Sequence, residues 1–171
     1  MISFYEINSE TFKYMNQFLD LMTIQKFEGD KKLELITIDI SRFEELKKLH
    51  LAYKLEIEEE IPKNSDYESL FNAIETGKIQ FFGVLNNDLL VAICSICITY
   101  STFNYKCSGI FEDFYIMPEF RHKRIARQLV EFAYHESGVC SLGVGAADCD
   151  VKMYKALGFF IELGNYLMFT E

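Results

Sequence analysis

The stretch that most constrains this chain is EDFYIMPEFRHKRIARQLVEFAYHES, residues 112–137. Its first part is apolar and aromatic enough for a strand, and its second part repeats apolar residues at helical spacing as far as Gly138. The turn between the two parts is strongly basic. A helix N-terminus offers unpaired backbone N–H groups and the positive end of a dipole, so this junction predicts a seat for an anion such as a phosphate. The alternative is an ordinary solvated charged face. The basic residues are Arg121, Lys123, Arg124 and Arg127.

Length and net charge limit the number of domains and the classes of partner that we expect. With 171 residues, half of them hydrophobic, we expect a single domain over residues 1–171 in which residues 1–30 form an N-terminal helical extension. The sequence has no run long enough for a membrane-spanning helix and no basic, apolar leader. A net charge of −9 disfavours nucleic acid and anionic membranes as partners, and it suits a cationic substrate.

The five cysteines give no sign of a metal or redox site. Cys94 and Cys97 lie three apart in a run that favours a strand, where their thiols would point to opposite faces. No second Cys or His pair completes a zinc site, so we expect no metal. Reduced, partly buried thiols are typical of a cytoplasmic protein.

Apolar periodicity and turn residues predict the order of the elements. An amphipathic helix at 9–27 is expected to serve as core or as a dimer contact. Ser41 with Glu44 and Ser65 with Glu68 resemble capping boxes that open helices, the first running to about residue 59 and the second ending near Gly77. Asn86 and Asn87 suit a tight hairpin turn. The expected strands are 33–39, 78–85, 89–100, 108–117, 139–145, 159–163 and 165–169, and the remaining helices are 121–137 and 148–157.

This order predicts an α/β (α+β) fold. Three strands joined in hairpin fashion, followed by helix and strand, imply a mixed, mainly antiparallel sheet of about six to seven strands. We expect helices on both faces and at least one parallel crossover.

At the basic turn the chain resembles the GNAT superfamily of N-acetyltransferases. The segment PEFRHKRIARQL is similar to the family's Arg/Gln-x-x-Gly-x-Gly/Ala loop, with Arg121 at the first position and Ala126 at the last. The resemblance implies that acetyl-CoA is the co-substrate and that loop amides cradle its pyrophosphate. It also implies that the preceding strand splays from its neighbour and binds the pantetheine arm. The implied cofactor-binding residues are Phe114, Tyr115, Ile116, Arg121, His122, Lys123, Arg124, Ile125, Ala126 and Arg127.

A second block strengthens the resemblance. MYKALGF is similar to the family's hydrophobic–Tyr–x–x–x–Gly–Phe segment, which implies that Tyr154 protonates the departing thiolate. A phenol, with a pKa of about 10, can give a proton to a thiolate without being ionised beforehand. Without that pairing, Tyr154 would be interpreted as a packed helix tyrosine.

Two positions depart from the family pattern. Arg124 stands where the loop usually has its middle glycine, which normally lets the backbone approach phosphate closely. Arg124 is expected either to add a charge-assisted contact or to crowd the site. Ala147 replaces a frequent asparagine seven positions before the tyrosine, which removes a side-chain contact to the cofactor.

The acceptor amine must lose a proton before it attacks. An alkylammonium has a pKa of about 10.4, so deprotonation at neutral pH costs about 4 to 5 kcal/mol, and a carboxylate base is the usual remedy. FEDFYIMPEFR is similar to the corresponding segment of diamine and polyamine acetyltransferases, which implies that Glu112 binds the amine and acts as base. Strand alternation would let only one of Glu112 and Asp113 face the acceptor. Upstream, KLEIEEEIPKNSDYE gathers acids that could hold further ammonium groups or form only a solvated helix end.

The sequence therefore predicts transfer of an acetyl group from acetyl-CoA directly to a primary amine of a small cationic acceptor similar to a polyamine or diamine. Aminoglycosides, amino acids and protein N-termini are alternative acceptors. A catalytically silent acyl-CoA-binding sensor is the alternative from another class. The N-terminal helix is expected to cover the acceptor site or to form a homodimer.

Overall fold

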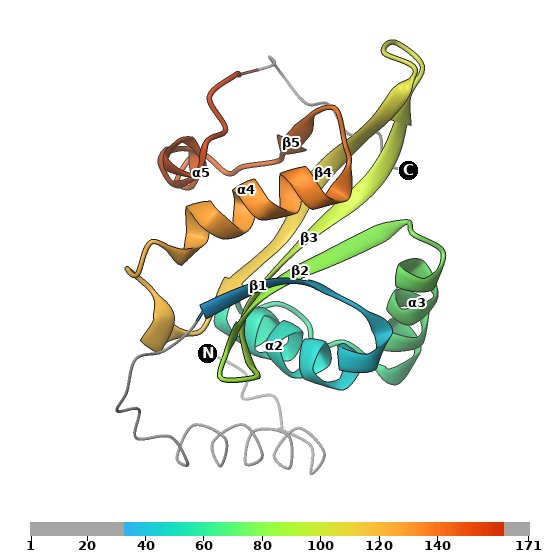
Figure 1. Ribbon diagram of the computed structural model, residues 1–171. Helices are drawn as coiled ribbons and strands as arrows, with labels where there is room; N and C mark the ends of the chain where they lie inside the picture. Colours follow the sequence, from blue (N-terminus) through green and yellow to red (C-terminus); the bar gives the residue numbers. More distant parts are fainter. Residues whose placement is uncertain (1–32, 163–171) are drawn as a thin grey trace, which may run out of the picture. The chain divides into compact units, whose positions relative to one another are not determined.

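The computed structural model describes residues 33–162, and within this part five strands form one sheet. The strands follow the order β1-β2-β3-β4-β5; neighbours are antiparallel except β4 and β5, which are parallel. Figure 1 shows this sheet running diagonally through the molecule. The strands are β1 (Leu33–Ile38), β2 (Ile79–Asn86), β3 (Leu89–Ser101), β4 (Lys106–Ile116) and β5 (Leu142–Val144).

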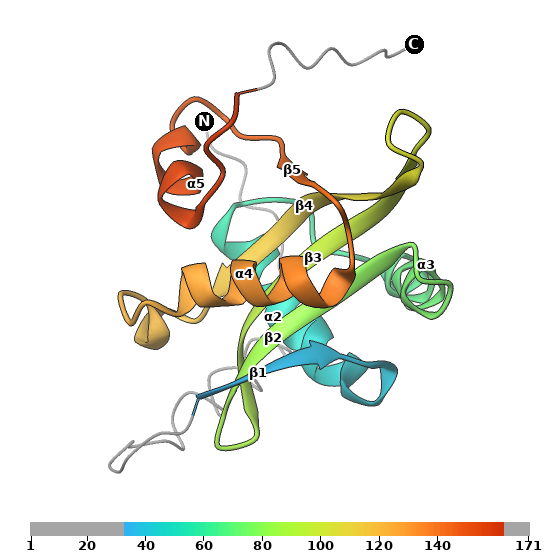
Figure 2. The same ribbon diagram turned by 45° about the horizontal axis from the view of Figure 1, so that its top comes forward.

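Helices cover both faces of the sheet. On one face α2 packs against β3 and β4, and α3 against β2; on the other face α4 packs across β1, β2 and β3 and also contacts α5 (Figures 1 and 2). The predicted mixed, mainly antiparallel sheet with helices on both faces and one parallel crossover is confirmed. The helices are α2 (Phe43–Glu56), α3 (Asn64–Glu75), α4 (Ile125–Ser137) and α5 (Val151–Leu157), with 3-10 turns η1 (Ile40–Arg42) and η2 (Pro118–Phe120).

The strand count and the last elements differ from the prediction. Residues 33–162 hold five strands rather than about six to seven, because residues 159–162 have no regular structure where a strand was expected. The predicted helix at 9–27 and the predicted strand at 165–169 lie outside the described residues. None of the helices between residues 33 and 162 is long and apolar enough to cross a membrane.

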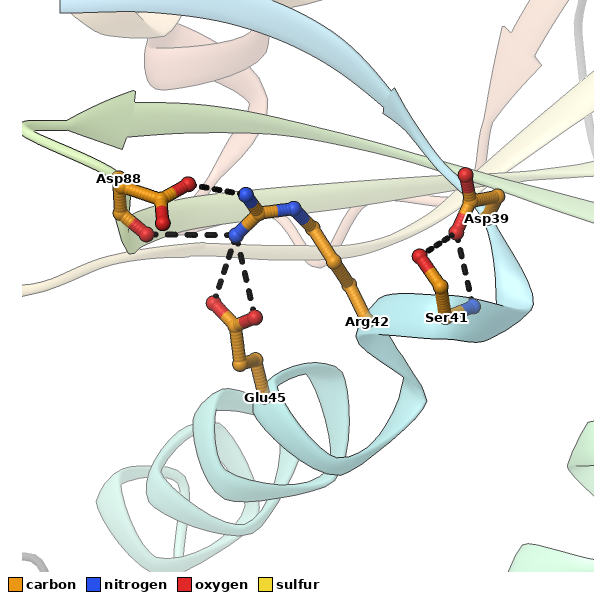
Figure 3. A network of polar contacts seen from close by, with 5 residues as sticks. All are labelled: Asp39, Ser41, Arg42, Glu45 and Asp88. Carbon is orange, nitrogen blue, oxygen red and sulfur yellow. Dashed lines mark hydrogen bonds and ion pairs between the residues drawn. The ribbon is translucent and has the colours of Figure 1, made fainter.

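The predicted first residues of the helices differ most from the structure. The predicted cap at Ser41 is wrong, because Asp39 instead accepts hydrogen bonds from the backbone N–H and the hydroxyl of Ser41, and α2 begins two residues later (Figure 3). Arg42 then pairs with Glu45 and with Asp88 of the β2–β3 turn, which ties the start of α2 to that hairpin (Figure 3). At α3 the box is likewise shifted: the Asp66 carboxylate accepts from the Lys63 N–H at 2.7 Å.

The ends of three helices and the β2–β3 turn lie at or next to the residues predicted for them, and these residues have the positive φ that such positions require. Gly77, Gly138 and Gly158 all adopt positive φ just after α3, α4 and α5, as helix-ending glycines should. The β2–β3 turn has positive φ at Asn87 and Asp88, one residue later than predicted. The reason is that pairing between the two strands continues through Asn86, which lies opposite Leu89.

The core lies between the sheet and its helices. The apolar face predicted for α4 is confirmed at four positions, of which Leu129 and Ala133 are fully buried; α2 contributes Leu46. The largest fully buried rings, Phe81, Phe82 and Phe111, belong to the strands. Packing of α4 on the sheet fixes where the helix begins, and therefore fixes the loop before it.

Candidate active site at the end of strand β4

Among residues 33–162, the edge of β4 that faces β5 has no strand partner beyond its midpoint. Pairing with β5 covers only Gly109, Ile110 and Phe111, whereas β4 continues to Ile116. On its other edge β4 stays paired with β3 as far as Ile116. An extended chain could therefore lie along residues 112–116 of β4, in the gap where β5 has ended.

The predicted pantetheine-binding residues occupy this segment. The Phe114 ring packs on Phe111, with centroids 5.7 Å apart. Tyr115 is buried against Tyr53 of α2, with centroids 6.3 Å apart. The Ile116 carbonyl accepts a hydrogen bond from Arg121 Nε at 2.8 Å. Met117 and the 3-10 turn η2 join these three residues to the basic loop.

The basic loop ends at the N-terminus of α4. The prediction that the helix begins at Arg121 is wrong: residues 121–124 form a turn, and the first helical residue is Ile125. His122 and Arg124 have φ of 60° and 62°, and no side chain caps the helix at Arg124. The amides of Ile125, Ala126 and Arg127 open a helix of 13 residues, so they face outward without intrahelical acceptors. This geometry fits an anion such as a pyrophosphate.

The basic side chains of the loop are mostly engaged within the protein. Arg121 donates to both carboxylate oxygens of Glu56 at 2.7 and 2.6 Å. Lys123 Nζ lies 4.8 Å from the centroid of the Phe120 ring, and Arg127 pairs with Glu131 at 2.8 Å. Within residues 33–162, Arg124 alone of the four makes no such contact. Its guanidinium is the one free to meet an anion at the seat.

Tyr154 lies on α5 and contacts Phe111, the last residue of β4 that pairs with β5. Its half-buried ring packs on Phe111 and Phe159, with centroids 6.4 and 5.8 Å away. Burial, with a smaller contribution from Asp150, raises the pKa of the Tyr154 phenol. The hydroxyl therefore keeps its proton at neutral pH, as a proton donor must.

A bulge in β4 brings two carboxylates together. The register places Glu112 and Asp113 opposite the single residue Ser95 of β3. Both carboxylates lie close enough to the Cys97 thiol to contribute, after burial, to raising its pKa to about 12. Simple strand alternation, which would separate the two side chains, therefore does not hold here. Glu112 is exposed, whereas Asp113 is largely buried.

Asp113 belongs to a polar network that sequence reasoning missed. Ser95 Oγ donates to Asp113 Oδ2 at 2.8 Å and accepts from the Asp113 N–H at 3.0 Å. His50 Nε2 of α2 lies 3.6 Å from Asp113 Oδ1. Burial alone would raise the pKa of Asp113, but the contacts with His50 and Ser95 lower it, so the group stays ionised. The available signal was Ser95 itself, a polar residue inside the apolar run VAICSICITY that would need a buried partner.

Aromatic rings surround this network. The His50 ring lies 6.4 Å from the Tyr53 ring and 6.2 Å from the Tyr67 ring, measured between centroids. Burial, then the charges of Asp113 and ionised Tyr154, raise the pKa of Tyr53 to about 12. Tyr53 is thus near both the bulge and the end of α5. The network and Tyr154 therefore lie in one neighbourhood beside the open edge of β4.

A surface depression of about 550 Å³ lies between α2 and α3, away from the basic loop; its lining is Phe43, Glu44, Lys47, Asn64, Tyr67, Glu68, Phe71 and Asn72. All five cysteines are free, and no cluster of His, Cys, Asp or Glu within residues 33–162 could hold a metal ion.

Solved structures share this architecture. A probable acetyltransferase superposes with a TM-score of 0.70 at 20% identity, covering 81% of this chain and 98% of that one. Glucosamine-6-phosphate N-acetyltransferase from Arabidopsis thaliana gives 0.63 at 13% identity, covering 82% and 99%. AAC(6')-Iy in complex with the bisubstrate analog CoA-S-monomethyl-acetylneamine gives 0.68 at 13% identity, covering 82% and 98%.

The sequence comparison identifies a domain. No curated protein sequence matches the chain, but residues 77–160 match the family model described as an acetyltransferase (GNAT) domain. The matched range contains the open edge of β4, the basic loop, α4 and Tyr154. The chain therefore has the GNAT fold, and residues 77–160 are similar to the GNAT acetyltransferase domain.

Proposed function

We propose that the protein transfers the acetyl group of acetyl-CoA directly to a primary amine of a small cationic acceptor. One observation carries this proposal: β5 leaves β4 after Phe111, and the freed segment is followed, after η2 and the turn at 121–124, by the N-terminus of α4. A strand edge without a partner, followed along the chain by the start of a helix, supports this proposal because it suits an extended amide-containing arm that ends in a pyrophosphate. When bound, acetyl-CoA supplies the thioester whose carbonyl carbon the amine attacks.

In this proposal, separate residues bind the cofactor, donate a proton and accept a proton. The amides that open α4, with the guanidinium of Arg124, seat the pyrophosphate, and residues 114–116 line the arm. The Tyr154 hydroxyl gives its proton to the leaving sulfur. One of the two bulge carboxylates takes the proton of the acceptor ammonium, a role that the family resemblance assigns to Glu112.

The polyamine-like acceptor is supported by charge. Of the acids near the end of α2 and the start of α3, Glu56, Glu59 and Asp66 are engaged with Arg121, Lys54 and the Lys63 N–H. Glu58, Glu60 and Glu68 are exposed and have no ion-pair partner within residues 33–162. These three carboxylates are the ones available to a second ammonium of a diamine or to the amines of an aminoglycoside.

The direct test measures binding and turnover together. Acetyl-CoA should raise the melting temperature, because it binds only the folded state, and free CoA should be released with spermidine, a simple diamine or an aminoglycoside. Tyr154→Phe and Glu112→Gln should each reduce release by about 10²-fold or more while the thermal shift remains. Tyr105→Phe at the exposed β3–β4 turn and Glu136→Gln on the exposed side of α4 are matched controls that should change neither readout.

A silent acyl-CoA-binding sensor is the second candidate. It is favoured by Arg124 at a left-handed position and by Arg121, whose guanidinium is already committed to Glu56. It predicts a thermal shift without CoA release on any amine. Absence of a shift at high acetyl-CoA concentration would contradict both candidates.

A further inference from the structure

The bulge offers two adjacent carboxylates with different surroundings. Glu112 is exposed, whereas the side chain of Asp113 is only 16% exposed and that of His50 only 11%. We infer that His50 and Asp113 act as one proton-accepting pair for the acceptor amine, leaving Glu112 to bind the amine's charge. This inference rests on the proposed acetyl transfer.

Ser95 fixes the orientation of Asp113. Its hydroxyl donates to Oδ2 and also accepts from the Asp113 N–H, so the carboxylate cannot rotate freely. Oδ1 is thereby directed to His50 Nε2, 3.6 Å away. The three residues come from three different elements, β3, β4 and α2, so the arrangement depends on the packed fold rather than on local sequence.

Only one of the two ring nitrogens of His50 faces a charged group among the described residues. Within the described residues Nδ1 is buried without a hydrogen-bond partner, whereas Nε2 faces Asp113. A proton that the ring gains or loses at Nε2 is therefore exchanged with Asp113 or with a group that reaches Asp113. A carboxylate alone is a weak base near neutrality, since a free one titrates at about 4, but imidazole titrates at about 6.5, close to the optimum for a general base.

The proton balance is simple. The acceptor ammonium gives one proton to Asp113 Oδ1, which passes it to His50 Nε2 to leave an imidazolium beside a carboxylate. The neutral amine then forms the new N–C bond as the C–S bond breaks, and the sulfur takes the Tyr154 proton. The second nitrogen proton restores Tyr154 through solvent, and His50 returns its proton to solvent, so one net proton is released per turnover.

Other titratable groups face this pair and must be separated from it. Tyr53 and Cys97 have pKa values near 12, and the pKa of Tyr154 is also raised, so none of these three loses a proton near neutrality. The remaining neighbours are Cys94 of β3, whose thiol pKa is raised by burial and by Asp113, Lys54 of α2, which lowers the pKa of Asp113, Tyr67 of α3, and Glu112 and Tyr115 of β4.

The first experiment is a pH–rate profile at saturating acetyl-CoA, with whichever of spermidine, 1,3-diaminopropane and kanamycin releases CoA. We expect the wild-type rate to fall toward acid with a single midpoint, because the His50–Asp113 pair then already holds the proton that it would take from the amine. His50→Gln should lower the rate at neutral pH by about 10² and move this midpoint by at least about one pH unit toward acid. Asp113→Asn should lower the rate similarly.

Controls separate proton transfer from structure. His135→Gln, an exposed histidine in the last turn of α4, should leave rate and midpoint unchanged. A merely structural role for His50 would lower the rate evenly at all pH values and leave the midpoint in place, and that result would overturn the inference. So would a wild-type midpoint unchanged in His50→Gln but moved in Glu112→Gln.

A second readout needs no turnover, so it stands even where the proposed transferase fails. NMR of the histidine rings should show the His50 signal changing at lower pH in Asp113→Asn than in wild type, because the carboxylate favours the imidazolium. The His135 signal should change at the same pH in both proteins. A His50 signal that is insensitive to the loss of Asp113, or that does not titrate at all, would overturn the pair whatever the activity.

Discussion

The basic loop before α4 and the bulge of β4 lie at the two ends of residues 112–127, yet they are built on opposite principles. The loop presents backbone amides, and three of its four basic side chains are engaged with neighbours. The bulge presents side chains, and the contacts of its Asp113 carboxylate are with Ser95 and His50, which are distant in sequence. A local motif can therefore reveal an anion seat, whereas a proton-transfer site is assembled only by the fold.

The largest effect is expected where α4 holds the loop in place. Leu129 is fully buried between α4 and the sheet, so Leu129→Ala should lower the free energy of unfolding by about 2–5 kcal/mol. Chemical denaturation measures this change. Gln128→Ala, at the neighbouring exposed position, is the control and should stay within about 0.5 kcal/mol of wild type. A similarly small change for Leu129→Ala would mean that α4 is not anchored by its apolar face.

The second effect tests the bulge. Asp113→Asn should lower the free energy of unfolding at neutral pH by about 1–3 kcal/mol, since it disturbs a buried, hydrogen-bonded charge. Because contacts with His50 and Ser95 lower the pKa of Asp113 below its unfolded value, the carboxylate stabilises the fold fully above that unfolded value, about 3.9. This stabilisation is lost as pH falls through the lower folded-state pKa.

The difference between variant and wild type should therefore shrink as the pH falls from about 5 toward 3. Denaturation curves at several pH values measure it. Glu112→Gln changes the exposed carboxylate of the same bulge and should have a much smaller effect on stability. An Asp113→Asn effect that grows as the pH falls from about 5 to 3 would contradict the assigned direction of the shift.

The same contrast explains what the sequence could predict. Apolar periodicity in α4 and alternation in the sheet strands indicated the fold, because the residues that share a buried face recur at short, regular intervals along the sequence. The helix starts were misplaced at Arg121 and Ser41, where a loop in left-handed geometry and a cap from Asp39 decided the boundary. The bulge was not predictable from alternation, since one extra residue changes which face each carboxylate meets.

The third effect concerns the departure from glycine in the loop. Arg124 has φ of 62°, which costs a non-glycine residue about 1–2 kcal/mol, while a glycine adds about 0.4–1 kcal/mol of entropy to the unfolded chain. Arg124→Gly should therefore raise the free energy of unfolding by up to about 1 kcal/mol, and Arg124→Ala should not. Denaturation measures the stability of both variants. Calorimetry with CoA then separates the effect of the Arg124 charge on binding from the effect of its backbone conformation. If the guanidinium contacts phosphate, both variants bind CoA more weakly. Tighter binding by Arg124→Gly alone would show that Arg124 crowds the seat.

The smallest effect is expected at the contact that joins the two regions, the pair between Arg121 in the loop and Glu56 at the end of α2. Its side chains are 36% and 45% exposed, so solvent screens the attraction and Glu56→Gln should cost only about 0.2–1 kcal/mol. The difference from wild type should vanish between about 0.1 and 1 M salt, since screening shortens the range of exposed charges. Glu58→Gln, an exposed neighbour with no ion-pair partner within residues 33–162, should show neither the cost nor the salt dependence. A larger cost that persists in high salt would mean that Arg121 couples the anion seat to α2, and with it to His50, more strongly than a surface ion pair can.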